Sequence, residues 1–223
     1  MSENVSSKIN VDSLRKRFIK YTRIAFQMLP KLEQPSILDV GCGSGLPTLE
    51  LTRLSNGKII GADIDQTQLE KLNRKIAEAG FSHRVKTINC SLFEMKFQDE
   101  SFDIIWAEGS IWMIGFEEGL KKWRPLLKPQ GFLVIHDLIK TVKNKLENVQ
   151  SYGYNLINQF MLPKDAWWTE YYQPLENRIK KLSKKYGNSS KALKALRKYQ
   201  NEIDRVKKNP EEQSSAFYIL QKS

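Results

Sequence analysis

Three acidic residues stand where the chain leaves an apolar, β-branched run. Asp39 follows "SIL", Asp63 follows "KIIGA" and Glu108 follows "FDIIWA". Such runs predict buried strands. A carboxylate at the end of a strand can accept hydrogen bonds from hydroxyl or ammonium groups, or take up a proton. Because ligands of parallel sheets bind at the carboxyl ends of the strands, we expect all three side chains on the ligand-binding edge.

A glycine-rich turn, "DVGCGSG", separates the first of these strands from a helix with Pro47 in its first turn. Glycine permits a positive φ and close approach of a ligand to the backbone, and the helix amino end offers free N–H groups. A P-loop would need Lys and Ser or Thr after its last glycine, but Leu46 follows Gly45. A dinucleotide turn would place its third glycine one position later. The pattern therefore argues against a phosphate cradle.

Strand and helix patterns alternate from residue 36 to 137, which predicts an α/β fold with a doubly wound, mostly parallel sheet and helices on both faces. The patterns predict strands at 36–41, 57–64, 84–90, 101–109, 131–138, 154–163 and 214–223. They predict helices at 12–29 (capped by Asp12 or Ser13), 47–55, 65–80, 116–127 and, split at 186–190, within 164–208. The turn "LKPQG" is expected before the fifth strand.

We expect one domain, residues 1–223, with an N-terminal helix within 1–30 and a core at 31–138. The C-terminal part, 139–223, contains a helical insertion at about 164–208 that could act as a lid. No apolar run approaches the ~20 residues of a membrane span, and the N-terminal residues lack a signal-peptide pattern, so a cytoplasmic protein is expected. Cys42 and Cys90 have neither disulfide nor metal-ligand spacing, so no metal is expected.

The formal charge of +11 is concentrated near the C-terminus, where residues 151–223 hold 14 Lys and Arg against 7 Asp and Glu. One interpretation is a surface for an anionic partner such as nucleic acid. The other is a solvated lysine-rich helix face. Apolar residues recur at helical spacing between the charges, as at Ile179, Leu182, Leu193 and Leu196, which favours the second interpretation.

The glycine turn and its neighbours resemble the class I S-adenosylmethionine-dependent methyltransferases. "LDVGCGSG" resembles their first motif, E/D-x-G-x-G-x-G, and "GADI" resembles the acidic end of their second strand. The segment from "FQDESFDIIWAEG" to "LKPQGFLVIHD" resembles their fourth strand, the following helix and the fifth strand. "FMLPKDAWWTEYYQPLENRIKKL" is similar to a bacterial group of small-molecule-type enzymes, distantly similar to the ubiquinone/menaquinone-biosynthesis methyltransferases. The resemblance implies a Rossmann-like, seven-stranded sheet with an antiparallel last strand, S-adenosylmethionine as methyl donor and S-adenosylhomocysteine as product.

The resemblance also implies the cofactor-binding residues. Asp39 would accept from loop N–H groups or from the cofactor's ammonium, and Asp63 would accept both ribose hydroxyls. The alternative for Asp63 is a helix N-cap, for which Asp65 is better placed. Ser91 stands where many relatives carry an aspartate, so its hydroxyl or the Leu92 N–H would bind the adenine edge. The remaining members of the set are Gly41, Cys42, Gly43 and Gly45 along the methionyl part, Ile64 on the adenine and Glu108.

Methyl transfer requires in-line alignment, exclusion of water and, for some acceptors, a proton acceptor. Glu108 and His136, each at the end of a strand, are the catalytic candidates; a loop cap and an ordinary strand-end histidine are the alternatives. Aromatic side chains could grip an apolar or cationic acceptor, although ordinary packing of an amphipathic helix explains them as well. These substrate-binding candidates are Tyr21, Trp112, Trp167, Trp168 and Tyr172.

The predicted function is methyl transfer to a small-molecule acceptor, in a monomer or a homodimer. One alternative is an RNA or protein methyltransferase that uses the basic C-terminal helices. Against it, the fourth strand is followed by Ala107-Glu108-Gly109-Ser110 and not by an (Asp/Asn)-Pro-Pro-(Tyr/Phe) motif, and the chain has no Pro-Cys nucleophile. A non-catalytic cofactor-binding scaffold is the other alternative.

Overall fold

The computed structural model describes residues 8–186 and 189–223, apart from the side chains of residues 141, 143 and 144. The chain divides into two compact units. Unit 1 comprises Met1–Phe18 and Leu162–Ser214, and unit 2 comprises Ile19–Met161 and Ser215–Ser223. The predicted single domain, with its N-terminal helix, core and lid-like insertion, stays a prediction.

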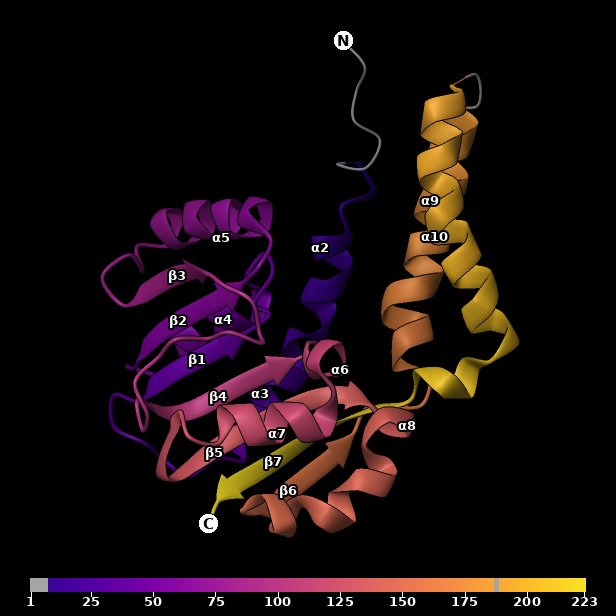
Figure 1. Cartoon of the computed structure of the whole chain (residues 1–223). Helices are drawn as coiled ribbons and strands as arrows, with labels where there is room; N and C mark the ends of the chain where they lie inside the picture. The colour runs from indigo at the N-terminus through magenta and orange to yellow at the C-terminus, as the bar shows by residue number, and fades with distance from the viewer. Residues whose placement is uncertain (1–7, 187–188) are drawn as a thin grey trace. The chain divides into compact units, whose positions relative to one another are not determined.

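Unit 2 is built on a seven-stranded sheet of order β3-β2-β1-β4-β5-β7-β6 (Figure 1). The first five strands are parallel, and β7 runs antiparallel to both β5 and β6. The predicted fold class is therefore confirmed. The strand order reverses between β1 and β4, where doubly wound sheets bind their ligands. The strands are β1 (Ser36–Val40), β2 (Lys58–Asp63), β3 (Val85–Asn89), β4 (Phe102–Glu108), β5 (Leu127–Leu138), β6 (Tyr154–Met161) and β7 (Ser215–Lys222).

The predicted helices of unit 2 that have a long stretch of helical hydrophobic periodicity are present in the structure. The described helices of this unit are α3 (Ile19–Gln27), α4 (Leu46–Leu54), α5 (Gln66–Glu78), α6 (Ile111–Ile114), α7 (Phe116–Trp123), α8 (Ile139–Val142) and η2 (Lys143–Tyr152). The sequence did not predict α6, α8 and η2, because α6 and α8 have only four residues each and the 3-10 segment η2 does not follow the 3.6-residue period of an α-helix. "LKPQG" is part of β5 and not a turn before it, and the β4–β5 register shifts between Phe102 and Ile104.

Unit 1 contains the predicted pair of C-terminal helices, seen as a hairpin in Figure 1. Part of the predicted break between them, residues 187–188, lies outside the described residues. The predicted helix 12–29 is three segments, and its predicted cap is wrong, because Asn10 caps α2 by accepting from the Ser13 N–H. The three segments are α2 (Val11–Arg15), η1 (Lys16–Phe18) and α3, of which α3 belongs to unit 2. The other described helices of unit 1 are the π-helical turn η3 (Trp168–Tyr172), α9 (Gln173–Lys185), α10 (Ser190–Lys208) and η4 (Pro210–Gln213).

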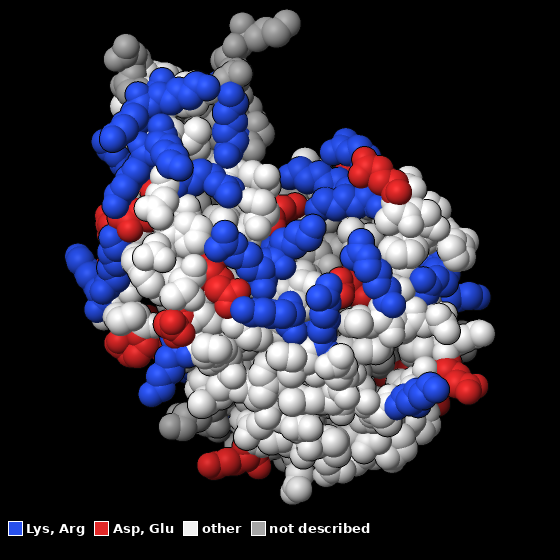
Figure 2. Space-filling view, turned by 180° about the vertical axis from the view of Figure 1, so that it is seen from behind, with Lys and Arg blue, Asp and Glu red and all other residues white. Residues whose placement is uncertain are grey.

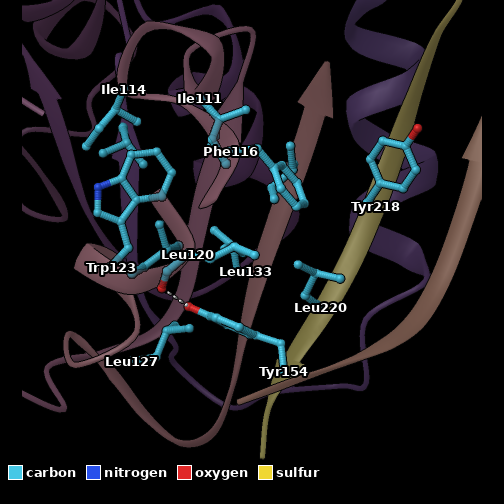
Figure 3. Packing of buried hydrophobic residues seen from close by; sticks show 14 of the residues in the cluster. Ile111, Ile114, Phe116, Leu120, Trp123, Leu127, Leu133, Tyr154, Tyr218 and Leu220 are labelled. Atoms are coloured by element: carbon cyan, nitrogen blue, oxygen red, sulfur yellow. Dashed lines mark hydrogen bonds between the residues drawn. The ribbon is translucent and has the colours of Figure 1, made fainter. Parts of the chain in front are cut away.

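A continuous apolar core lies between the sheet of unit 2 and helix α7 (Figure 3). α7 buries Phe116, Leu120 and Trp123 along one side. Tyr154 of β6 is fully buried in this core, and its hydroxyl donates to the Leu120 carbonyl at 3.2 Å. Burial of large side chains of this kind contributes roughly 2 kcal/mol each. The core therefore holds β4 and β5 rigidly beneath the edge where the acidic residues lie.

Gly45 provides a test of how the glycine turn is fixed. Its φ is +79°, and an added Cβ would lie 2.0 Å from Cδ1 of Leu72 on α5. Gly45→Ala should therefore lower the free energy of unfolding by about 3 kcal/mol, through backbone strain and a forced shift of α5. Gly80→Ala is the matched control, because Gly80 has a φ of +74° but nothing within 4 Å, so it should cost only about 1 kcal/mol. Urea denaturation measures both; equal losses would contradict the packing argument.

Candidate active site

The glycine turn joins β1 to α4 and is tied to the neighbouring strand. The N–H groups of Gly41 and Cys42 donate to the carbonyl of Ala62 on β2, at 2.8 and 3.1 Å. The Gly45 N–H donates back to the Cys42 carbonyl at 2.9 Å. From the other side, Lys75 Nζ donates to the Ser44 carbonyl at 2.9 Å. The turn is thus fixed to the sheet edge and to α5 together.

Gly43 lies where the turn meets open space. Its N–H donates to Asp63 Oδ2 at 2.7 Å. A Cβ added at Gly43 would meet no heavy atom within 4 Å, whereas one added at Gly41 would lie 2.6 Å from Ser110 Cβ. The backbone at Gly43 is therefore approachable, which is what a ligand bound along the turn requires.

Asp63 and Asp65 divide two tasks between them. Asp65 caps α5, because its Oδ1 accepts from the N–H groups of Thr67 and Gln68 at 2.9 and 3.2 Å. Asp63 Oδ1 accepts the N–H of Asp65 at 2.8 Å. The prediction that Asp65 is the cap is confirmed. Each Asp63 oxygen accepts one backbone N–H and retains lone-pair capacity for a ligand hydroxyl.

Asp39 is buried below the turn, with 1% of its surface exposed. Its Oδ2 accepts the hydroxyl of Thr48 on α4 at 2.5 Å. The predicted role of Asp39, as acceptor for loop N–H groups or for the cofactor's ammonium, stays a prediction. Burial raises the pKa of Asp39 to about 7, and the charges of Glu108 and Asp63 act in the same direction.

Glu108 ends β4 with its carboxylate held by two donors. Trp106 Nε1 donates to Oε2 at 3.0 Å, and the Thr22 hydroxyl of α3 donates to the same oxygen at 3.1 Å. Burial raises the pKa of Glu108 to about 7, although both hydrogen bonds oppose the shift. The pairing of Thr22 with Glu108 was not predictable from sequence patterns, because the two residues are 86 positions apart. The adjacent Tyr21, a predicted substrate-binding residue, is buried.

His136 of β5 pairs in register with Glu108. Its Nε2 lies 3.0 Å from the Ser215 hydroxyl, and its ring stacks on Phe217 with centroids 4.4 Å apart. Burial lowers the pKa of His136 to about 4, so the imidazole is neutral at pH 7 and a weak proton acceptor. Of the two acid–base candidates, Glu108 has the pKa better matched to neutral pH.

Ser110 follows the end of β4 and was not among the predicted residues. Its hydroxyl oxygen is buried and has no hydrogen-bond partner among the described residues. It lies beside Gly41, whose added Cβ would approach the Ser110 hydroxyl oxygen to 3.3 Å. An orphaned hydroxyl next to the glycine turn fits a polar ligand group. The next helix, α6, exposes Trp112 and Met113.

The end of β3 lies beside the end of β2. The Cys90 N–H donates to the Asp63 carbonyl at 3.1 Å. The hydroxyl of Ser91 accepts the Phe93 N–H at 3.2 Å, so it remains able to donate to a ligand. Leu92 is buried, whereas Phe93 and Ile64 are 51% and 71% exposed. The structure thus adds the exposed ring of Phe93 to the apolar side chains at this edge of the sheet, a residue that the sequence analysis did not name.

The predicted substrate-binding residues belong to both units. Tyr21 and Trp112 lie in unit 2, and Trp167, Trp168 and Tyr172 lie in unit 1. Cys42 is buried in unit 2, and burial raises the pKa of its thiol. Across the described residues, no group of three or more His, Cys, Asp or Glu is placed to hold a metal ion. No helix in the same part of the chain is long and apolar enough for a membrane span.

Comparison with known proteins finds similar sequences over the segment that carries this site. Residues 37–131 match the family model of the methyltransferase domain. The methyltransferase GfsG of Streptomyces halstedii is 29% identical over 63% of this chain and 50% of its own length. Sterol 24-C-methyltransferase erg6 of Aspergillus fumigatus is 31% identical over 53% of this chain and 31% of its own length. The chain thus spans half or less of these curated relatives.

Solved structures share the fold. A methyltransferase from Geobacter sulfurreducens in complex with S-adenosylhomocysteine has a TM-score of 0.75 at 15% identity, covering 92% of this chain and 91% of that one. The [4+2]-cyclase SpnF has a TM-score of 0.74 at 19% identity, covering 91% and 80%. The family match over residues 37–131 and the glycine turn thus agree with the resemblance to the class I S-adenosylmethionine-dependent methyltransferases, and the solved structures show that the chain shares their fold.

Proposed function

We propose that this chain transfers a methyl group from S-adenosylmethionine to a small-molecule acceptor. The observation that carries the proposal is the acidic edge formed by Asp39, Asp63 and Glu108 around the open backbone at Gly43. Among the described residues, no Lys or Arg forms an ion pair with any of the three. Buried carboxylates without a cation are costly. A ligand that carries positive charge would offset that cost.

Each part of this edge fits one part of the cofactor. Asp63 would accept hydrogen bonds from the ribose hydroxyls. Ile64 and Phe93 would pack against the adenine ring, and the Ser91 hydroxyl or the Leu92 N–H would bind the polar edge of the adenine. The backbone of Gly41, Cys42, Gly43 and Gly45 would run along the methionyl part. The free hydroxyl of Ser110 would donate to its carboxylate, and Asp39 or Glu108 would accept from its ammonium. When bound, the cofactor supplies a methyl group already activated by the sulfonium.

Glu108 is the proposed proton acceptor. An acceptor that carries a proton on its nucleophilic atom must lose it when the new bond to the methyl carbon forms. A carboxylate with a pKa of about 7 can take that proton at neutral pH. His136, with a pKa of about 4, would instead help to position the end of β5 through its contacts with Ser215 and Phe217.

The acceptor is proposed to be a small molecule, because several relatives are named for small-molecule substrates. They include the sterol enzyme above and a 27-O-demethylrifamycin SV methyltransferase from Amycolatopsis mediterranei, 27% identical over 50% of this chain and 42% of its own length. Tyr21, Trp112, Trp167, Trp168 and Tyr172 remain proposed acceptor contacts, and a homodimer remains a proposal. One structure with the same fold is named a [4+2]-cyclase, so the fold by itself does not establish methyl transfer. Methyl transfer therefore has to be tested in addition to cofactor binding.

Asp63→Asn should weaken S-adenosylmethionine binding about ten- to a hundredfold, because hydrogen bonds to a charged carboxylate contribute about 1.5–3 kcal/mol. Isothermal titration calorimetry measures the dissociation constant. Asp65→Asn is the control, since asparagine also caps helices and should leave the affinity within about twofold. Equal losses in the two variants would place the ribose away from Asp63.

Glu108 makes stability depend on pH in a defined window. Its pKa rises from an ordinary value of 4.5 to about 7 in the fold because of burial, so between these pH values the native state binds the proton more tightly than the unfolded chain does. The unfolding free energy of the cofactor-free protein should therefore fall as the pH rises from about 4.5 to 7. Glu108→Gln should reduce this fall, as measured by urea denaturation across the range, and Asp39, whose pKa is also raised to about 7, accounts for what remains. Glu118→Gln, at an exposed carboxylate of α7, should leave the whole fall unchanged.

A labelled-methyl experiment tests the acceptor class. The protein is incubated with methyl-labelled S-adenosylmethionine and a bacterial extract, which is then separated into small molecules, RNA and protein. We expect label in the small-molecule fraction, and about a hundredfold less with Glu108→Gln if a proton must be removed. Label in RNA or protein would support the macromolecular alternative. Cofactor binding without transfer to any fraction would support a scaffold.

A further inference from the structure

Unit 1 contains a cavity of its own, of about 410 Å³. This volume lies in the range of small-molecule pockets. The cavity is formed where the segment before η3 meets the end of α10 and η4, and all its lining residues belong to unit 1. The principal ones are Lys164, Trp167, Trp168, Val206, Lys207 and Pro210.

The two indoles of this cavity differ in their surroundings. Trp167 packs within an aromatic cluster, 4.5 Å from the ring of Phe18 and 5.9 Å from that of Tyr171 between centroids. Its position is therefore explained by packing. Trp168 has no aromatic partner of this kind among the described residues; its recorded ring contact is with Lys207, whose Nζ lies 5.4 Å from the ring centroid. Trp168 thus presents a flat apolar surface beside a cation.

The lining of the cavity holds two cations, Lys164 and Lys207, against one carboxylate, Asp165, so its net charge favours an anion. Lys164 is exposed and has no carboxylate partner among the described residues. Lys207 shares the carboxylate of Glu176 with Lys180, at 2.7 and 3.1 Å, so that two cations meet one anion. The Gln213 carboxamide oxygen accepts from the Tyr172 hydroxyl at 3.5 Å, which leaves its N–H groups to donate.

The charge of the whole unit acts in the same direction. Unit 1 holds 17 Lys and Arg against 9 Asp and Glu, so it carries +8 of the chain's +11. Between Asn177 and Asn201 there are nine basic residues and no acidic one. In Figure 2 the blue side chains gather at the upper left, over the α9–α10 hairpin. Such a field raises the local concentration of anions.

We propose that the unit 1 cavity binds a small organic anion with a flat apolar body, with Trp168 as the apolar wall and Lys164 as the charge partner. The proposal does not rest on the cofactor site, because no lining residue belongs to the acidic edge of unit 2. It assigns Trp167 and Trp168, named above as proposed acceptor contacts, to a separate site in unit 1. That site differs from the cofactor site in the sign of the ligand's charge.

Calorimetry with 2-naphthoate on the full chain tests this site. We expect binding that weakens about tenfold in Trp168→Ala, through loss of buried aromatic area, and about threefold in Lys164→Gln. Lys184→Gln removes the same charge from an exposed position of α9 outside the cavity, and Trp112→Ala removes an exposed indole of unit 2. Both controls should bind 2-naphthoate as the parent does. The neutral 2-naphthylmethanol should bind at least threefold more weakly than the anion.

Trp168→Phe keeps a ring in place if the alanine variant does not fold, and should show a smaller loss of affinity in the same direction. Asp63→Asn should bind 2-naphthoate unchanged, so failure of the cofactor prediction leaves this result interpretable. Unchanged binding in the Trp168 variants, equal binding of the neutral alcohol, or displacement of 2-naphthoate by S-adenosylmethionine would overturn the proposal.

Discussion

The active site depends on the cost of holding carboxylates at one edge of a buried parallel sheet. The order β2-β1-β4 brings the ends of three neighbouring strands together, and each end carries an acid, Asp63, Asp39 or Glu108. Burial raises the pKa of Asp39 and of Glu108 to about 7. The fold supplies neutral donors to these groups, from Thr48, Thr22, Trp106 and the Gly43 N–H. Full compensation requires a positive charge, which the methyl donor brings.

The surrounding structure keeps that edge from relaxing. Gly45 packs so closely on Leu72 that the turn cannot move toward α5, and the Ala62 carbonyl fixes it to β2. The core under β4 and β5, with Trp123 and Tyr154 fully buried, prevents Glu108 from turning away from the edge with its strand. A site on strand ends and one short turn is held more precisely than a site on long loops. Rigidity here is a condition for in-line transfer.

The sequence predicted the parts of this site that depend on neighbours along the chain. The strand–helix alternation, the glycine turn and the cap of α5 at Asp65 are local patterns, and the structure has them. Contacts across the fold were not predictable, since periodicity says nothing about pairs such as Thr22 and Glu108 or about the unpartnered Ser110 hydroxyl. The helix cap at Asn10 was missed for a different reason, because the helix begins at Val11, one position before the predicted start.

The two units also differ in the kind of ligand charge that they can accept. In unit 2, acids without ion-pair partners lie at the open glycine turn, although the unit as a whole carries only +3. In unit 1, a net +8 surrounds a cavity walled by an indole. A cation is stabilised at the first and repelled at the second, and the reverse holds for an anion. The difference in charge therefore favours a cationic methyl donor at the glycine turn of unit 2 and an anionic organic ligand in the cavity of unit 1, independently of the shapes of the two sites.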